Sequence, residues 1–464
     1  MDDEIFTTEA GRRRLAQEWL ASWLRTRRWF GAKDRPIRDC RIVRHTAVGQ
    51  SWLCAVEVQF DDGARDAYLL PLTRVSSAEA AAVVATVSGG VLVDATHVPA
   101  FRAALFQVLA GREFADDLTV EGNAALAEAA NDPPVSRVLT VEQGNSSIVY
   151  GDRWLVKLFR KLEAGANPEV EMARFLGVRA EFPHTPPFHG TLSWGGSDLA
   201  LVNEFLPESV DGWELALHYR QQPGDPAMRE EWRKIVQQLG ERAGEMHLAL
   251  ANAADDPAFS PEPITRDDVE TIMRSMLETA RTALGELEGP AASQLPDGES
   301  LLREFFTALQ GMQPIQRLLD QVQALPPEGV KIRVHGDFHL GHVRYRPGEI
   351  LFSNFEGEPL RTTAQRRAKQ PPVRDVAAML RSLAYAQASA DPLPLPWTNA
   401  AADQAAFLTG WRSRVGGTAL AAEFLLPIFL LEKAFYELSH ELKHRPDWAH
   451  IPMRGIIALC RSLE

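Results

Sequence analysis

The sequence is poor in cysteine, in net positive charge and in long hydrophobic runs. Its three cysteines, Cys40, Cys54 and Cys460, are too few and too scattered for a disulfide framework or a zinc site, so we expect free thiols in a reducing compartment. The formal net charge of −13 argues against nucleic acid as the main partner, because a phosphate backbone requires a basic protein face. It is compatible with nucleotide binding, which needs only a few local cations.

The sequence also lacks the features of a targeting or membrane segment. The first residues, MDDE, are acidic and do not have the basic and apolar regions of a signal peptide. The most apolar stretch, residues 424–431, is far shorter than the roughly 20 residues that span a bilayer. We therefore expect a cytoplasmic protein without a membrane segment. Its 464 residues, 45% of them hydrophobic, predict a globular enzyme of two to four domains at roughly 150 residues per domain.

The first 130 residues predict a small α+β domain. Apolar residues recur at helical spacing over residues 8–25. Apolar runs at 54–60 and 67–72 predict two strands, and the DDG sequence at 61–63 supplies the turn of a hairpin between them. We expect this part of the chain to have a hydrophobic core of its own.

Beyond it, the NDPP sequence at 131–134 predicts a linker to a second strand-rich region. Short strand patterns follow, interrupted by one helix expected at 168–177. The remainder is largely helical, with one expected pair of short strands, 330–334 with 350–355. This order predicts an α+β, protein-kinase-like fold with a small strand-rich lobe and a large helical lobe. The expected parts are residues 1–130, 131–206 and 207–464.

The segment 335–342 has the sequence HGDFHLGH and follows an expected strand. Phosphoryl transfer needs a carboxylate that orients and deprotonates the acceptor hydroxyl, together with metal ions that bridge the nucleotide phosphates. Asp337 suits that role, because a glycine-containing loop after a strand is rigidly held and accessible. The alternative is that Asp337 caps a turn while His335 packs beneath it. The complete segment favours a catalytic loop.

A second polar turn, SNFEGEP at 353–359, ends the strand that is expected to pair with the one before His335. In kinases of this kind such a position holds the aspartate that binds magnesium, and here it is Asn354. An asparagine offers one neutral oxygen and is therefore a weaker ligand. Glu356 and Glu358 lie on the same turn. Either they replace the missing carboxylate or they bond the backbone.

Lys157 is the charged residue in an otherwise apolar strand, WLVKLF. A buried lysine is costly unless it is paired, and the helix expected after residue 168 offers Glu169 and Glu171. A strand lysine paired with a helix glutamate grips nucleotide phosphates in kinases. The alternative is a surface lysine whose stem covers apolar surface.

The preceding turn at 143–147 has the sequence QGNSS. Its small polar residues expose backbone N–H groups, as anion binding requires. We expect this turn, with Asn145, Ser146 and Ser147, to cover the nucleotide phosphates.

A helix near the C-terminus combines polar and aromatic residues in the sequence EKAFYELSHE, 432–441. Such groups suit sugar hydroxyls, which need hydrogen bonds and an apolar stacking face; the alternative is a solvated face with charge pairs four residues apart. Trp213, beside Asp211, is expected to form another wall of the sugar site. Spacings of three and four place four side chains of the helix on adjoining faces: Lys433, Tyr436, Glu437 and His440.

Taken in order, these motifs resemble those of bacterial maltokinases, including those fused to trehalose synthase. Maltokinases are relatives of the aminoglycoside phosphotransferases with an added N-terminal cap domain. The likeness extends over nearly the whole chain. The matching segments are RWFGAK at 28–33, EQGNSS at 142–147, KLFR at 157–160, NPEVE at 167–171, HGDFHLG at 335–341, FEGEP at 355–359, RDVAAMLRS at 374–382 and RPDW at 445–448.

The resemblance implies a cap domain at 1–130 and transfer of the ATP γ-phosphate to the anomeric hydroxyl of maltose, with Mg²⁺ or Mn²⁺ as cofactor. The product, maltose 1-phosphate, serves α-glucan synthesis, and a trehalose synthase-type enzyme is a candidate partner. Asp337 would be the base, and Lys157 with Glu171 the pair that grips the phosphates. The implied nucleotide-binding residues are Lys157, Glu171, Asn145, Ser146, Ser147 and Glu204. The implied substrate-binding residues are Asp211, Trp213, His339, Glu356, Lys433, Tyr436, Glu437 and His440.

The chain departs from the family pattern at three positions. His342 stands where the family has glutamine and Asn354 where it has aspartate, the two protein ligands of the metal; His440 replaces a usual tyrosine. Loss of a carboxylate and an amide oxygen weakens a site for a hard cation, and an imidazole suits manganese or other transition ions better. Two functions therefore compete. One is an ATP-dependent kinase for maltose or another sugar such as glucosamine; the other is a pseudokinase that binds a sugar or regulates an enzyme of trehalose–glycogen metabolism.

Overall fold

The structure of the protein is a computed structural model that describes residues 4–112, 117–139, 144–220, 225–289, 295, 298–359, 361–390 and 398–463. The chain divides into a strand-rich unit and a helical unit. The first comprises Met1–Val178 with Pro186–Glu208, and the second Arg179–Thr185 with Ser209–Glu464.

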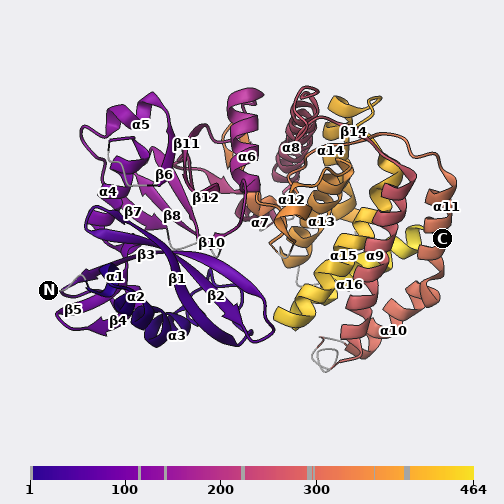
Figure 1. The fold of residues 1–464 in the computed structure, drawn as a ribbon. Helices are drawn as coiled ribbons and strands as arrows, with labels where there is room; N and C mark the ends of the chain where they lie inside the picture. Colours follow the sequence, from indigo (N-terminus) through magenta and orange to yellow (C-terminus); the bar gives the residue numbers. More distant parts are fainter. Residues whose placement is uncertain are drawn as a thin grey trace. The chain divides into compact units, whose positions relative to one another are not determined.

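The strand-rich unit contains two sheets, each of six strands among the described residues. The first has the order β1-β2-β3-β5-β4 with β10 paired to β3, and the second has the order β6-β11-β12-β9-β8-β7 (Figure 1). The helices of this unit are α1 (Glu4–Thr7), α2 (Glu9–Leu15), α3 (Ala21–Arg25), α4 (Pro99–Leu109), α5 (Ala124–Ala129) and α6 (Pro168–Arg174). The strands are β1 (Ile37–Val48), β2 (Ser51–Phe60), β3 (Arg65–Val75), β4 (Val83–Val87), β5 (Gly90–Asp94), β6 (Leu118–Gly122), β7 (Ser136–Leu139), β8 (Asn145–Tyr150), β9 (Trp154–Phe159), β10 (Lys161–Leu162), β11 (Phe188–Trp194) and β12 (Ser197–Glu204).

The N-terminal helix forms where its apolar spacing predicts it. Thr8 caps it by accepting a 3.0 Å hydrogen bond from the backbone N–H of Gly11. A π-helical segment, Ala16–Leu20, separates α2 from α3, which ends at Arg25. The DDG turn joins β2 to β3 as predicted, with Gly63 at a φ of +85° that favours glycine.

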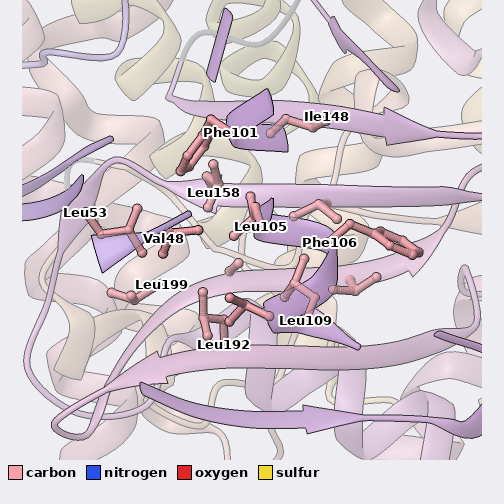
Figure 2. Packing of buried hydrophobic residues seen from close by; sticks show 14 of the residues in the cluster. Val48, Leu53, Phe101, Leu105, Phe106, Leu109, Ile148, Leu158, Leu192 and Leu199 are labelled. Atoms are coloured by element: carbon pink, nitrogen blue, oxygen red, sulfur yellow. The ribbon is translucent and has the colours of Figure 1, made fainter. Parts of the chain in front are cut away.

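The two sheets share one hydrophobic core. Helix α4 supplies Phe101, Leu105 and Leu109, and these pack with Leu53 of the first sheet and Leu192 of the second (Figure 2). A separate cluster buries α2 and α3 against the other side chains of the first sheet. The N-terminal part therefore has a core of its own, as expected, and a second core in common with the strands that follow residue 135.

A buried ion pair also joins the two sheets. Arg160 follows β9 and is 1% exposed, and its guanidinium lies 2.7 Å from Asp94 at the end of β5. The same guanidinium lies over the indole of Trp29, with Cζ of Arg160 4.9 Å from the ring centroid. Asp94 in turn accepts hydrogen bonds from the backbone and hydroxyl of Thr96. Because both charges are shielded from water, removal of either partner would leave an uncompensated buried charge and destabilise the fold.

The second unit is mainly helical, with two short two-stranded pairings and one added strand. Its glycines permit close helix packing: a Cβ on Gly240 or Gly410 would lie about 2 Å from backbone oxygens of the facing helix. Figure 1 shows these two helices, α8 and α14, side by side. The helices are α7 (Gly212–Arg220), α8 (Pro226–Ala251), α9 (Arg266–Leu287), α10 (Gly298–Leu309), α11 (Gln313–Ala324), α12 (Thr363–Arg367), α13 (Val373–Ala390), α14 (Thr398–Val415), α15 (Leu426–His444) and α16 (His450–Ser462). The strands are β13 (Val210–Asp211), β14 (Glu262–Pro263), β15 (Val330–Lys331), β16 (Val343–Arg346) and β17 (Glu349–Phe352).

The predicted pairing of strands 330–334 and 350–355 is wrong. β15 pairs with β14, whereas β17 pairs with β16 to form a local hairpin. Pro347 and Gly348 make the turn of that hairpin, and Gly348 has a φ of +82°. A hairpin closed by two residues costs less loop entropy than a pairing across 20 residues of chain, so the local partner is preferred.

The described residues contain no helix that is both long and apolar enough to cross a membrane.

Replacement of Asp94 by alanine should lower the free energy of unfolding by about 3–5 kcal/mol, since it leaves the Arg160 guanidinium buried without a counter-charge. Urea unfolding, followed by circular dichroism, measures the change. The matched control is Asp152→Ala, which breaks the exposed pair with Arg137 and should cost no more than about 1 kcal/mol. Equal effects of the two substitutions would contradict a stabilising role for the buried pair.

Candidate active site

The segment that carries Asp337 is held by its backbone. Ile332 bonds Gln370 in both directions, at 2.8 and 3.0 Å, and Phe338 is fully buried beyond it. Gly336 has a φ of +83°, a conformation that favours glycine and turns the chain immediately before Asp337. The side chain of Asp337 is thus presented from a rigid turn, as the sequence predicts.

Asp375, at the start of α13, fixes this turn from below. Its carboxylate accepts hydrogen bonds from the backbone N–H groups of His335, at 2.8 Å, and Gly336, at 3.0 Å. His247 lies 3.2 Å from the same carboxylate, and its other ring nitrogen accepts from the indole of Trp411. Burial would raise the pKa of Asp375, but the bond from His247 and the backbone donors lower it. Asp375 belongs to the RDVAAMLRS motif at 374–382, but nothing in the motif itself indicates this role.

Asp337 faces a lysine from the C-terminal part of the chain. One carboxylate oxygen lies 3.6 Å from Nζ of Lys433 on α15, and the other lies 3.7 Å from Nε2 of His339. Burial by itself would raise the pKa of Asp337, but the neighbouring imidazole of His339 and the charge of Lys433 hold it well below its ordinary value. The carboxylate is therefore ionised at neutral pH.

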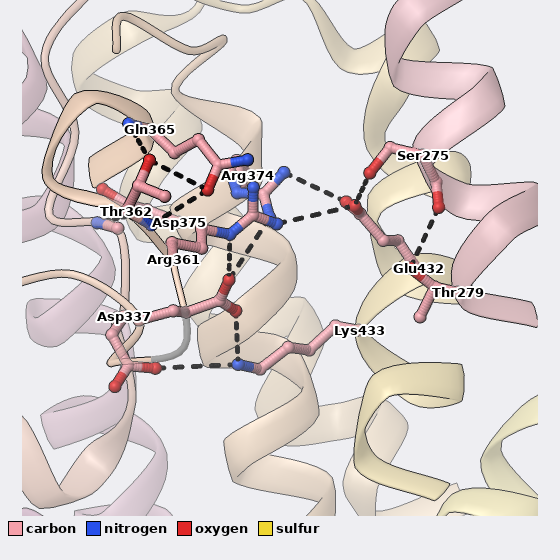
Figure 3. Close-up of polar contacts among 12 residues, drawn as sticks. Ser275, Thr279, Asp337, Arg361, Thr362, Gln365, Arg374, Asp375, Glu432 and Lys433 are labelled. Atoms are coloured by element: carbon pink, nitrogen blue, oxygen red, sulfur yellow. Dashed lines mark hydrogen bonds and ion pairs between the residues drawn. The ribbon is translucent and has the colours of Figure 1, made fainter. Parts of the chain in front are cut away.

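Lys433 also contacts Glu358, at 3.1 Å, so one ammonium lies between two carboxylates (Figure 3). Burial would lower the pKa of Lys433, yet the two carboxylates raise it. The pKa of Glu358 would likewise rise by burial, but Lys433 and the nearby Arg374 and Arg361 lower it to about 2. All three groups at this point are charged.

The network continues through two arginines to α9. Arg361 donates to Glu358, and Arg374 donates to Glu432 at 3.0 Å. Glu432 also accepts a 2.6 Å hydrogen bond from the hydroxyl of Ser275, on α9. Each buried carboxylate in this group thus has at least one cation and one further contact, as burial requires.

A pocket lies beside this network. It encloses about 410 Å³ of empty space, including its opening to solvent. Phe429 and the ring of Tyr436 give it apolar surface, and Gly336, the residue before Asp337, also lines it. Its charged lining consists of Glu358, Glu432, Arg361, Arg374, Asp375 and Lys433. We call it the Lys433 pocket.

The residues expected to bind substrate are only partly gathered there. Lys433 and Tyr436 line the Lys433 pocket, with the ammonium 4.8 Å from the ring centroid. Glu437 is instead bound by both donors of Arg381, at 2.9 and 2.7 Å. His440 packs against His444 one turn further along the helix.

The other expected substrate residues have structural contacts of their own. Asp211 accepts from the backbone N–H of Trp213, at 2.7 Å, at the start of α7. The ring of His339 accepts a hydrogen bond from the backbone of Gly341. Glu356 accepts through its backbone carbonyl from Arg366. A role for these residues in sugar binding stays a prediction.

His342 and Asn354 lie at the same end of the β16–β17 hairpin. His342 directly precedes β16, and the backbone N–H of Ser353 bonds its carbonyl at 3.0 Å. Asn354 follows with a φ of +62°. Nδ1 of His342 donates to the carbonyl of Asp337, at 2.8 Å, which leaves Nε2 as the lone-pair atom. Burial, with the neighbouring imidazoles of His339 and His335, lowers the pKa of His342 well below its ordinary value.

This donor set can hold a divalent cation. Asp337, His339 and His342 each offer one ligand atom, and these atoms lie within 4.8 Å of one another. Asn354, on the adjoining turn, carries a neutral amide oxygen in its side chain. Glu358, considered from the sequence as a replacement ligand, is engaged by Lys433 and Arg361 instead.

The residues expected to bind nucleotide belong to the strand-rich unit. Lys157 lies in the middle strand β9, buried, with Nζ 2.8 Å from the carboxylate of Glu169 on α6. The resemblance implied Glu171 as the partner of Lys157. Glu169 forms the ion pair given above, and a role for Glu171 beside Lys157 stays a prediction.

The predicted turn at 144–147 is wrong for three of its residues, because Asn145, Ser146 and Ser147 lie in the neighbouring strand β8 and pair with β9. Ser147 is opposite Lys157 in the β8–β9 register, and Asn145 is opposite Phe159. The hydroxyl of Ser146 accepts from Arg160 at 2.8 Å. Residues 142 and 143 of the matching motif lie outside the described residues.

Glu204 ends β12, and its carboxylate lies 3.8 Å from Nε2 of His189. Burial lowers the pKa of His189. The contact is too long for a hydrogen bond, so Glu204 keeps acceptor capacity for a ligand.

Comparison with known proteins now defines the fold. Residues 23–97 match the maltokinase N-terminal cap domain. The chain is a divergent, kinase-like protein with this cap. A glucosamine kinase of Streptacidiphilus jiangxiensis is 28% identical over 335 residues, which are 68% of this chain and 71% of the relative. A glucosamine kinase of Mycolicibacterium smegmatis is 26% identical over 343 residues, 70% of this chain and 79% of the relative.

Solved structures of glucosamine kinase share the architecture of this kinase-like protein. One crystal form matches with a TM-score of 0.73 and 22% identity, covering 96% of this chain and 99% of the solved chain. A complex with glucosamine, ADP and inorganic phosphate matches with a TM-score of 0.69, covering 96% and 98%. The fold is thus α+β and protein-kinase-like, with a sheet-rich lobe, a helical lobe and an N-terminal cap, which confirms the predicted fold class.

Replacement of Glu358 by glutamine should destabilise the kinase-like protein at neutral pH by about 3 kcal/mol, the equivalent of a carboxyl pKa lowered from 4.5 to about 2. Because the folded pKa is depressed, this stability is present above about pH 4.5 and is lost as the pH falls toward 2. The free energy of unfolding should therefore decline less steeply in the variant than in the wild type over this acid range. Parallel pH curves for the two proteins would contradict the assignment.

Proposed function

We propose that the protein is an ATP-dependent sugar kinase in which Asp337 is the catalytic base. The observation that carries the proposal is the ionised carboxylate of Asp337, presented by a rigid turn next to the polar and aromatic Lys433 pocket. The names of the curated relatives, both glucosamine kinases, support a sugar as acceptor.

The reaction needs one proton and one phosphoryl group to move. Asp337 accepts a hydrogen bond from the acceptor hydroxyl, and the hydroxyl oxygen forms a bond to the γ-phosphorus as the bond to the β-phosphate oxygen breaks. The proton passes to the Asp337 carboxylate, and ADP leaves. Because its pKa is low, Asp337 is a weak base, so its larger contribution is to orient the hydroxyl and take the proton late, as suits a loose transition state.

Lys157 and Glu169 would hold the nucleotide phosphates. The ion pair keeps the buried ammonium charged and its Nζ in place, which a phosphate-binding lysine requires. Asn145, Ser146 and Ser147, at the start of β8, keep their expected places in the nucleotide site as part of this proposal. Glu171 and Glu204 keep their expected places in the nucleotide site as part of this proposal.

A divalent metal would be held by His342 through Nε2 and by Asn354 through its amide oxygen. Bound there, the ion would supply positive charge that offsets the negative charge of the nucleotide phosphates. Asp337 contributes the adjoining negative charge. A set with one imidazole nitrogen and one neutral oxygen favours Mn²⁺ over Mg²⁺.

The acceptor sugar has two candidates. The cap domain favours maltose, as in the maltokinases that the sequence resembles. The glucosamine kinase relatives favour glucosamine. The resemblance also suggests a cytoplasmic role in trehalose–glycogen metabolism and a trehalose synthase-type partner, and both stay hypotheses. Domain boundaries at residues 130 and 206 stay part of the same proposal.

The replacement Asp337→Asn should reduce phosphotransfer by about 10²–10⁴-fold while sugar binding stays nearly intact. A coupled assay of ADP release over a panel of sugars, in Mg²⁺ and separately in Mn²⁺, measures the change. The matched control is Asp320→Asn, which alters an exposed carboxylate on α11. Equal turnover by Asp337→Asn and wild type would show that another group acts as base.

The alternative function is a pseudokinase, which Asn354 and His342 favour because both differ from the metal ligands of the family. It predicts sugar binding without ADP release for every sugar and both metals. Any sugar-dependent ADP release that Asp337→Asn removes would exclude it.

The double replacement His342→Gln with Asn354→Asp should tighten binding of ATP with magnesium, because it restores two oxygen ligands and one negative charge. Calorimetric titration with ATP and each metal compares the variant with the wild type. We expect the wild type to bind ATP–magnesium weakly and to prefer manganese. Tight magnesium–ATP binding by the wild type would contradict this proposal.

A further inference from the structure

A second hollow adjoins the Lys433 pocket and is more basic. It encloses about 300 Å³ of empty space, including its opening. The two hollows share Gly336, Glu358, Arg361 and Arg374. The polar side chains that line the second hollow are Arg361, Arg366, Arg374, Gln365, Gln370 and Glu358. We call it the arginine pocket.

The charges of the arginine pocket favour an anion. Three guanidinium groups line it against one carboxylate, Glu358. That carboxylate is already engaged by Lys433 and Arg361, which lower its pKa to about 2. Glu432, which bonds Arg374, lines the Lys433 pocket and not the arginine pocket. An entering anion therefore meets guanidinium groups rather than open carboxylates.

Two of the lining side chains keep hydrogen-bond donors for a ligand. Arg361 uses Nε for Glu358 and one terminal nitrogen for Glu432, and its other terminal nitrogen has no partner among the described residues. The amide oxygen of Gln365 accepts from Thr362 in a capping box, so its NH₂ group remains the donor. Figure 3 shows Gln365, Arg361 and Arg374 gathered in one group.

Glycines form the floor of this pocket and hold Arg366 over it. Gly357 has a φ of +75°, and a Cβ there would lie 3.2 Å from Cγ of Arg366. The stem of Arg366 thus lies across Gly357, while one terminal nitrogen bonds the carbonyl of Glu356 at 3.0 Å. A Cβ on Gly336 would be 3.3 Å from the backbone of Gly357. The arginine head is therefore positioned before any ligand arrives.

We propose that the arginine pocket binds a phosphate-class oxyanion, either inorganic phosphate or the phosphoryl group of a sugar phosphate. Planar guanidinium groups match phosphate oxygens with paired N–H donors, which a lysine cluster does not. This proposal goes beyond the proposed sugar kinase function and rests on it only in taking the neighbouring Lys433 pocket as the sugar site.

The test is calorimetric titration of the full chain with inorganic phosphate, without nucleotide or metal and at constant chloride ionic strength. Arg366→Gln should weaken phosphate binding about ten- to a hundredfold, because Arg366 lines the arginine pocket alone. The matched control is Arg367→Gln, which removes the same charge from the next residue of α12 and should leave the affinity within about twofold. Gln370→Glu, which adds a repelling charge to the lining, should weaken binding as well.

Parallel titrations separate the sources of the anion. Tighter binding of a hexose 1-phosphate than of inorganic phosphate would identify a sugar phosphate as the ligand, and the reverse order would identify free phosphate. Lys157→Gln tests the nucleotide site as the place of binding. Loss of phosphate binding in Lys157→Gln but not in Arg366→Gln, equal loss in Arg366→Gln and Arg367→Gln, or no binding by the wild type would overturn the proposal.

The failure of either idea can be recognised separately. Sugar-dependent ADP release without phosphate binding would contradict the arginine-pocket proposal and leave the kinase proposal standing. Phosphate binding that depends on Arg366, without sugar-dependent ADP release, would support the arginine-pocket proposal and contradict the kinase proposal.

Discussion

The ammonium of Lys433 lies between two buried carboxylates and contributes to the charge state of both. Burial would raise the pKa of Asp337 and of Glu358, and Lys433 lowers both, together with His339 at Asp337 and with Arg374 and Arg361 at Glu358. Glu358 in turn contacts Arg361 and Arg374. One positive charge from α15 therefore orders residues that are about 75 and 95 positions earlier in the chain. This is why the pocket is built from α13, α15 and the loop between 353 and 361 rather than from any contiguous motif.

Features that depend on neighbouring residues could be predicted from the sequence. The hairpin turn at 61–63, the helix over 168–174 and the turn that presents Asp337 each follow from local glycine, capping or apolar spacing. The lysine in an apolar strand likewise indicated a paired, buried group before any contact was known. Such signals need no knowledge of distant partners, because a few bonds in one stretch of chain determine them.

Features that depend on a choice between similar partners could not be predicted. Glu169 and Glu171 both lie in the first turn of α6, and the sequence alone does not decide that Glu169 pairs with Lys157, because packing of the whole helix sets its phase. Strand β15 pairs with β14, which lies about 70 residues earlier, and no pattern in either short strand indicates the other as its partner. Asp375 and Glu432 were missed for the same reason: a charged residue on a helix is expected to be solvated until its buried partner is known.

The same dependence on distant partners explains why charged residues, rather than apolar ones, shape the candidate site. A hydrophobic core tolerates exchange of one apolar side chain for another of similar volume, whereas a buried charge demands its counter-charge at a given place. Arg160 with Asp94, Lys157 with Glu169, and Lys433 with Asp337 and Glu358 each meet that demand between separate elements of their own unit. In the proposed metal site, asparagine in place of aspartate at position 354 would remove one charge and alter the ion that the site prefers.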